Sequence, residues 1–130
     1  MSWVVVDTSV VSYILKKHSL ASAYWQILKD RSLAISFMTV AELYRWPLQR
    51  HWNDRRTLQL QQHIRGYTLL RHTISMSREW AKIKCRRGRP ISDADAWIAA
   101  TALLYGIPVV THNPRHFLNI DGLEVLTVNT

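Results

Sequence analysis

Short β-branched segments alternate along this chain with longer stretches of helical periodicity, and this alternation restricts the fold more than any other feature. Strands are expected near residues 3–6, 33–38, 108–111 and 123–128, with a short strand or a connection at 67–70. Parallel strands need long crossover connections, which are usually helical. The pattern therefore predicts one α/β domain over residues 1–130, a three-layer α/β/α arrangement around a mostly parallel central sheet.

Helices are expected between these strands, and proline and glycine mark some of their ends. The expected segments are residues 10–15, 19–29, a helix opening at 39, 53–65, 75–86 and 94–105, with a short turn or helix from 113. Pro47 should interrupt its helix, because proline lacks a backbone donor and clashes with the preceding turn. Gly106 should end the last long helix, since glycine readily adopts the left-handed conformation common at helix C-termini.

Composition and charge exclude several classes of protein. A hydrophobic share of 48% and six tryptophans exclude a disordered chain, while no apolar run approaches the roughly 20 residues that span a bilayer. The first residues do not resemble a secretion signal, and a single cysteine, Cys85, cannot form an internal disulfide, so we expect a cytoplasmic protein. The net charge of +8 favours a polyanionic partner, nucleic acid or an acidic protein, although basic surfaces also serve solubility alone.

Acidic residues are scarce in this chain, and four of them fall where a strand meets a helix or a helix begins. They are Asp7, Glu42, Asp93 and Asp95. Each has a structural explanation: Asp7 can cap the helix that follows it, and the spacings Thr39-x-x-Glu42 and Ser92-x-x-Asp95 fit capping boxes. Asp93 would be favoured in a first helical turn by the helix dipole.

The positions of these acids nevertheless predict that they converge. Ligand sites in open parallel sheets lie beyond the carboxyl ends of the strands, where Asp7 and the segment 111–113 are expected. Carboxylates crowded at one place repel each other unless a cation neutralises them. Oxygen ligands suit Mg²⁺ or Mn²⁺, and the chain lacks the His and Cys spacings of a zinc site. Such an ion can activate water for attack on a phosphodiester, which predicts a metal-dependent nuclease.

The sequence resembles the PIN-domain toxins of bacterial VapBC pairs over nearly its whole length. The resemblance is carried by residues 3–9, 39–43, 88–102 and 109–117. Its most specific part is Asp95-x-x-Ile-Ala-Ala-x-Ala, followed by a short strand and Thr111-x-Asn113. The resemblance implies an endoribonuclease toxin dependent on Mg²⁺ or Mn²⁺, an RNA substrate, a small antitoxin protein as partner, and a homodimer.

The resemblance also implies roles for individual residues. It assigns metal binding and catalysis to Asp7, Glu42 and Asp95, with Asp93 as an additional member and Asn113 as a fourth polar ligand. Asn113 keeps an oxygen but carries no charge, so we expect one ion to bind firmly and a second only when RNA is present. It further implies that hydroxyls orient a carboxylate or a metal-bound water; the alternative is ordinary turn hydrogen bonding. These hydroxyls belong to Thr8, Ser9 and Thr111.

Basic and tryptophan residues are compatible with several roles. A basic segment before the Asp93 region could contact RNA, bind an acidic partner or form a solvated helix face. It consists of Lys82, Lys84, Arg86, Arg87 and Arg89. Trp3, Trp25 and Trp97 are assigned to packing. Trp46 and Trp52 are left unassigned, and Trp46 stands where members of the family often have a small residue.

Three other functions are compatible with parts of this pattern. Asn113 would also suit a catalytically weak or inactive PIN fold that binds RNA or protein. A solitary RNA-processing nuclease would have the same acids and no antitoxin. A phosphotransferase that uses Asp7 as a covalent nucleophile is disfavoured, because Ser9 stands where such enzymes have a second Asp. Cys85 lies between basic residues in a predicted helix and is interpreted as incidental.

Overall fold

The central sheet has five strands, all parallel, and it confirms the predicted α/β class. A computed structural model describes residues 2–88 and 90–128. The strands occur in the order β3-β2-β1-β4-β5. They are β1 (Trp3–Val6), β2 (Ser32–Ser36), β3 (Thr68–Leu70), β4 (Val109–Val110) and β5 (Val125–Leu126).

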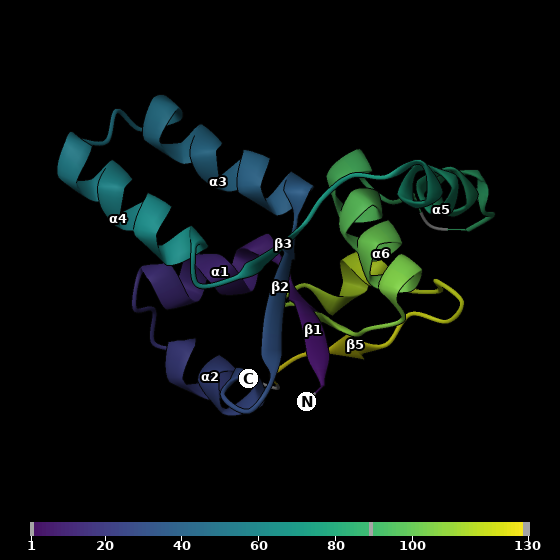
Figure 1. Cartoon of the computed structure of the whole chain (residues 1–130). Helices are drawn as coiled ribbons and strands as arrows, with labels where there is room; N and C mark the ends of the chain where they lie inside the picture. The colour runs from purple at the N-terminus through teal and green to yellow at the C-terminus, as the bar shows by residue number, and fades with distance from the viewer. Residues whose placement is uncertain (1, 89, 129–130) are drawn as a thin grey trace.

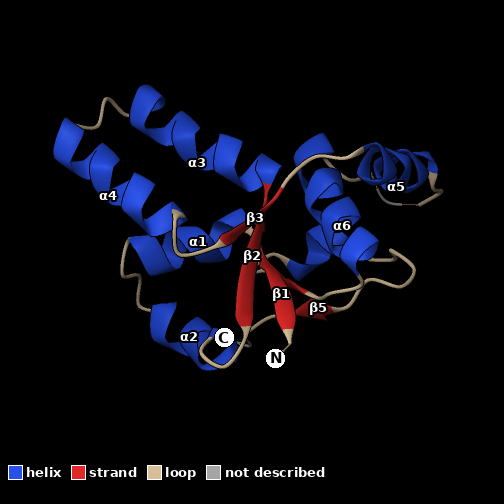
Figure 2. Ribbon diagram, viewed as in Figure 1, coloured by secondary structure: helices blue, strands red, loops and turns tan. Residues whose placement is uncertain are grey.

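Helices cover both faces of this sheet, as the predicted three-layer arrangement requires (Figure 2). One face carries α1 (Thr8–Leu15), α2 (Ala21–Leu28), α3 (Phe37–Gln49) and α4 (Asp54–Ile64). The other face carries α5 (Ile74–Cys85) and α6 (Asp93–Tyr105), and the 3-10 helix η1 (Pro114–Phe117) follows β4. Within the described ranges, no helix has the length and hydropathy needed to cross a membrane.

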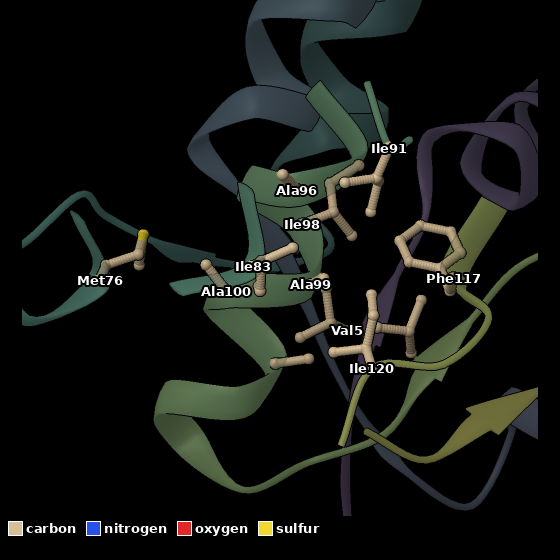
Figure 3. Close-up of a cluster of buried hydrophobic side chains, with 12 residues drawn as sticks. Val5, Met76, Ile83, Ile91, Ala96, Ile98, Ala99, Ala100, Phe117 and Ile120 are labelled. Carbon is tan, nitrogen blue, oxygen red and sulfur yellow. The ribbon is translucent and has the colours of Figure 1, made fainter. Parts of the chain in front are cut away.

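Strand β1 lies at the centre of the sheet and is buried on both faces. Val4 and Val6 pack into the cluster formed with α1–α4, while Val5 packs into the cluster formed with α5 and α6 (Figure 3). This alternation follows from the period of two residues in a strand. A strand covered on both faces needs a continuous apolar run, which explains the sequence Trp3–Val6.

The order of the strands places a change of winding direction between β1 and β4. The chain proceeds from β1 to β2 and β3 on one side, and then returns to add β4 and β5 on the other side of β1. Val6 pairs with Val110, and the Asp7 amide donates a 2.9 Å hydrogen bond to the Val110 carbonyl. Asp7 and Thr111 therefore lie side by side at the carboxyl edge, where α/β sheets commonly bind ligands.

Helix α3 differs from the prediction at both ends. It begins at Phe37 with Ser36 as its N-cap, so the predicted Thr39–Glu42 capping box is wrong. The Ser36 hydroxyl accepts the Met38 amide at 3.1 Å. Pro47 does not interrupt the helix, which continues to Gln49. Pro47 is buried, and its burial offsets part of the cost of the hydrogen bond to the preceding turn that proline cannot donate.

The ends of α6 agree with the prediction. Ser92 is its N-cap, with the Ser92 hydroxyl accepting the Asp95 amide at 3.1 Å. Gly106 is its C-cap in the left-handed conformation, with a φ of 65°. Favourable caps at both ends fix the position of the first turn, which carries Asp95.

Two of the three tryptophans assigned to packing are in fact exposed. Trp3 is 41% exposed at the start of β1, and Trp25 is 49% exposed on α2, which buries Tyr24 and Leu28 instead. Trp97 packs against the buried cluster on the α5–α6 face, as predicted. An aromatic residue at an element's end or on a helix's outer face is not forced inside, because folded proteins expose much apolar surface.

Candidate active site

A pocket of about 270 Å³ lies at the carboxyl edge of the sheet and brings together three acids from different elements. Asp7 follows β1, Glu42 belongs to α3, and Asp95 belongs to the first turn of α6. Asn113 and His116, which come after β4, also line it. Carboxylates separated by more than 80 residues of sequence therefore face one cavity.

Asp7 is the most buried of the three acids, with 5% of its surface exposed. Its carboxylate accepts hydrogen bonds from the Thr8 amide at 2.8 Å, the Ser9 hydroxyl at 3.0 Å and the Thr111 hydroxyl at 2.6 Å. Burial raises the pKa of Asp7, and nearby Asp95 raises it further, whereas the three hydrogen bonds act in the opposite direction. Asp7 is also the N-cap of α1, so its structural and candidate functional roles coexist.

Glu42 is held by a hydroxyl from the neighbouring helix. The Thr8 hydroxyl lies 2.8 Å from Glu42 Oε1 and 2.9 Å from the Thr39 hydroxyl. Burial raises the pKa of Glu42, the charges of Asp7 and Asp95 raise it further, and the Thr8 hydrogen bond and Arg45 lower it. Thr39 thus helps to position Thr8 instead of capping α3.

His116 belongs to the pocket and was not predicted from the sequence. Its Nδ1 lies 3.2 Å from Asp95 Oδ2, and both side chains line the pocket. The signal that could have identified it is its spacing from Asn113, because residues three apart in a 3-10 helix lie on the same side. Asn113 is the N-cap of that helix, η1, and also lines the pocket.

Asp93 does not lie with the other acids. Its side chain is 75% exposed, forms a 2.8 Å ion pair with Lys84, and is absent from the pocket lining. Residues two apart in a helix point in different directions, which explains why Asp93 and Asp95 separate. The expectation that Asp93 belongs to the acidic cluster therefore disagrees with the geometry.

The predicted basic contacts lie mainly on α5 and are occupied by the protein itself. Lys82 pairs with Glu79 at 3.4 Å, and Lys84 pairs with Asp93. Arg86 donates to the Asn119 carbonyl at 2.9 Å. Arg87 is exposed, and Arg89 lies outside the described residues. None of the described four lines the acidic pocket.

The donor set in the pocket fits a divalent cation, although it is not a complete chelate. Over residues 2–88 and 90–128, no three His, Cys, Asp or Glu side chains stand close enough to hold one ion together. The carboxylates of Asp7, Glu42 and Asp95 nevertheless share one pocket; the charge of Asp95 raises the pKa of Asp7, and the charges of Asp7 and Asp95 raise the pKa of Glu42. Clustered carboxylate oxygens are the donors that Mg²⁺ prefers, and Mg²⁺ usually keeps several waters or substrate oxygens as its other ligands.

Comparisons with known proteins agree with this fold over more than nine-tenths of the chain. The chain is 28% identical over 131 residues to "Ribonuclease VapC1" of Haemophilus influenzae strain R2866, covering 92% of each protein. The structure of DNA-bound VapBC from Salmonella typhimurium matches with a TM-score of 0.84 at 24% identity, covering 98% of each chain. VapBC-1 from nontypeable Haemophilus influenzae matches with a TM-score of 0.79 at 25% identity, covering 96% of this chain and 97% of that one.

The family follows from the sequence match together with the site. The family model described as "PIN domain" matches residues 4–123, a range that contains every residue of the acidic pocket. The resemblance carried by the sequence motifs is thereby confirmed at the level of the family. This chain belongs to the PIN domain family.

Proposed function

We propose that this protein is a metal-dependent endoribonuclease that acts in the cytoplasm as the toxin of a VapBC pair. The observation that carries the proposal is the convergence of Asp7, Glu42 and Asp95 in one pocket at the carboxyl edge of the sheet. The names of the relatives support it, since the curated proteins similar to this chain are called ribonucleases VapC. Similar solved structures are of VapBC complexes, which supports a small antitoxin protein as the partner.

Asp7, Glu42 and Asp95 would hold Mg²⁺ or Mn²⁺ in this proposal. A bound divalent ion lowers the pKa of a coordinated water and stabilises the negative charge that develops on the phosphodiester. Burial raises the pKa of Asp7 and Glu42, and the charge of Asp95 raises both further, so without a cation this crowding of carboxylates costs free energy. Asn113 adds a neutral oxygen at the same pocket.

The hydroxyl residues around the pocket keep the carboxylates in position. The hydroxyls of Ser9 and Thr111 both donate to Oδ2 of Asp7. The other oxygen, Oδ1, accepts a hydrogen bond from the Thr8 amide. Thr8 fixes Oε1 of Glu42, so the second oxygen of that carboxylate stays available. Outer hydrogen bonds of this kind orient metal ligands, and their loss typically weakens metal binding about 10- to 100-fold.

The test is cleavage of single-stranded RNA by the purified protein with Mg²⁺ or Mn²⁺ present and with EDTA. We expect cleavage only with a divalent ion, and a loss of at least about 100-fold in Asp7→Asn, Glu42→Gln and Asp95→Asn, as is usual when a charge-stabilising group is removed. Asp121→Asn is the matched control, since Asp121 is an exposed acid outside the acidic pocket. Cleavage that persists in EDTA or in Asp7→Asn would refute the proposal.

The antitoxin is tested separately from the nuclease. We expect that co-purified antitoxin blocks RNA cleavage and that its removal restores it. A cleaving enzyme encoded without any neighbouring inhibitor would instead be a solitary RNA-processing nuclease.

Asp93→Asn should retain most of the activity, because Asp93 pairs with Lys84 outside the pocket.

A further inference from the structure

A cluster of cations and tryptophans lies where α1 and α3 end and α4 begins, and we call it the cation–tryptophan surface. It consists of Lys16, Trp46, Arg50, Trp52 and Arg56. Lys16 Nζ lies 4.8 Å and the Arg50 guanidinium 5.2 Å from the centre of the Trp46 ring. The Arg56 guanidinium lies 4.0 Å from the centre of the Trp52 ring. Cation–π contacts therefore hold three positive charges in place before any ligand binds.

The three cations of this surface, Lys16, Arg50 and Arg56, have no acidic ion-pair partner in the described part of the chain, residues 2–88 and 90–128. Burial lowers the pKa of Lys16, and the charges of Arg50 and Arg56 lower it further. Like charges held close together raise the free energy of the surface, and a bound anion would relieve this repulsion.

A hollow of about 180 Å³ opens within the surface. Lys16, Arg56 and Trp52 line it, together with Leu15 and Gln59. The hollow is several times larger than the roughly 30 Å³ that one water molecule occupies in the liquid, so it has room for a phosphate group. The basic residues of α5 offer no equivalent, because Lys82 and Lys84 are paired with acids.

Two helices connect this surface directly with the acidic pocket. Helix α1 begins at Thr8, which contacts Glu42, and ends beside Lys16. On α3, Trp46 follows Glu42 by four residues and Arg50 follows it by eight, which is about 6 Å and 12 Å along the axis. Both helices extend to the same side of the sheet (Figure 1), and Lys16 touches Trp46 across them. A strand bound in the pocket could therefore continue over the surface.

We propose that the cation–tryptophan surface binds the phosphate backbone of the RNA strand on one side of the bond that is cut. The inference rests on the proposed function, which it deepens by assigning the contacts that hold the substrate. A nucleic acid fits better than an acidic protein, because Lys16 and Arg50 lie at the far ends of the two helices, α1 and α3, that carry Thr8 and Glu42 of the acidic pocket.

The first experiment measures binding without cleavage. A fluorescently labelled 12-nucleotide RNA is titrated in EDTA, and its anisotropy is followed at several salt concentrations. We expect Arg50→Ala/Arg56→Ala to weaken binding about tenfold and to reduce the slope of log K against log salt by about 1.4, or about 0.7 for each phosphate of a single strand that is no longer neutralised. The matched control is Arg65→Ala/Arg71→Ala, which removes the same charge from exposed arginines outside the surface. This control should change the slope far less.

The second experiment separates substrate binding from chemistry. With a divalent ion present, Arg50→Ala/Arg56→Ala should raise KM for the RNA while kcat/KM for bis(p-nitrophenyl) phosphate, which has no extended strand, stays unchanged. Lys16→Gln should give a smaller effect of the same kind. Far-UV circular dichroism and the thermal midpoint establish that each variant is folded, and Lys16→Gln serves as the independent test if the double variant is not.

The outcomes distinguish this proposal from the nuclease proposal. If the protein cleaves RNA but Arg50→Ala/Arg56→Ala binds RNA as tightly as the control Arg65→Ala/Arg71→Ala, the surface is not an RNA site. Polyglutamate is titrated in the same way as the RNA. If Arg50→Ala/Arg56→Ala loses affinity for polyglutamate while its RNA affinity is unchanged, the proposal is overturned and the ligand is an acidic protein. A protein that binds RNA through the surface but never cleaves it would refute the nuclease and leave this site standing.

Discussion

The Thr111 hydroxyl donates a 2.6 Å hydrogen bond to Asp7 Oδ2 across 104 positions of sequence. Both residues follow neighbouring parallel strands, β4 and β1, and Thr111 is fully buried. The bond thus connects the last part of the chain to the first, at the most buried acid of the pocket. It stabilises the charged form of Asp7, whose pKa burial would otherwise raise further.

Thr111→Val should destabilise the protein by about 1–3 kcal/mol, because it leaves a buried carboxylate oxygen with one donor fewer. Thr111→Ser keeps the hydroxyl and is the matched control, with a smaller loss from the missing methyl group. Urea unfolding at neutral pH measures both variants. Equal stability of the valine variant and the original protein would mean that this hydrogen bond does not support the fold.

Asp7→Asn should stabilise the metal-free protein at neutral pH. The pKa of Asp7 is raised in the folded state, so its contribution to stability is present below its unfolded value of 3.8 and is lost as the pH rises through the folded value. Replacing the carboxylate with an amide removes this penalty above the folded pKa and changes little in strong acid. Urea unfolding in EDTA between pH 3 and pH 7 measures the difference between the two proteins, which should grow with pH.

With Mn²⁺ added, the original protein should become more stable than Asp7→Asn, since only the carboxylate binds the ion strongly. The thermal midpoint of the original protein should rise with Mn²⁺ concentration, as expected for a ligand that binds the folded state. Asp7→Asn should respond weakly. An equal rise in both proteins would show that the ion binds elsewhere.

His116→Ala should tighten Mn²⁺ binding in the absence of RNA. The imidazole lies 3.2 Å from Asp95 Oδ2 and competes with a cation for that carboxylate. Isothermal titration gives the affinity, and Arg115→Ala at the exposed neighbouring position is the control. Weaker binding by His116→Ala would contradict this prediction and indicate that the imidazole is itself a ligand.

The free energy of unfolding should fall as the pH drops below about 6.5 because of His63. Burial lowers the pKa of this imidazole, so its contribution to stability is present above its unfolded value of 6.5 and is lost as the pH falls through the folded value. His63→Gln should flatten this part of the pH profile, whereas substitution of the exposed His51 should not. His63 also shares a 3.0 Å hydrogen bond with the Tyr67 hydroxyl, and its loss would lower stability at every pH. The variant and the original protein are therefore compared by how steeply their free energy of unfolding changes with pH, and not by its absolute value.

The sequence predicted that Asp7, Glu42 and Asp95 share one pocket because strands and helices can be recognised from local patterns that recur along the chain. A β-branched run ending in Asp7 marks a buried strand, and the order of strands and helices brings Glu42 and Asp95 to the same edge. The capping of α3 was mispredicted because both Ser36 and Thr39 are good N-caps. Pairing of β2 with β3 through Ser36 determines where the strand ends, and that pairing is not visible in local sequence.

The positions of Asp93 and His116 depended on details that spacing alone does not give. Asp93 and Asp95 are both first-turn acids, yet only one of them faces the pocket, because the rotation of α6 is set by its alanine-rich packing against the sheet. His116 reaches Asp95 only because η1 turns the chain back after β4. Both depend on tertiary packing.

The central position of β1 makes the pocket depend on contacts between distant parts of the sequence. Asp7 follows β1, whereas Asp95 and Thr111, which complete its surroundings, lie 88 and 104 positions further along the chain. Contacts between residues so far apart in sequence are slow to form, because the chain between them must first be ordered. A partly folded chain in which β4 has not yet paired with β1 therefore has no complete centre.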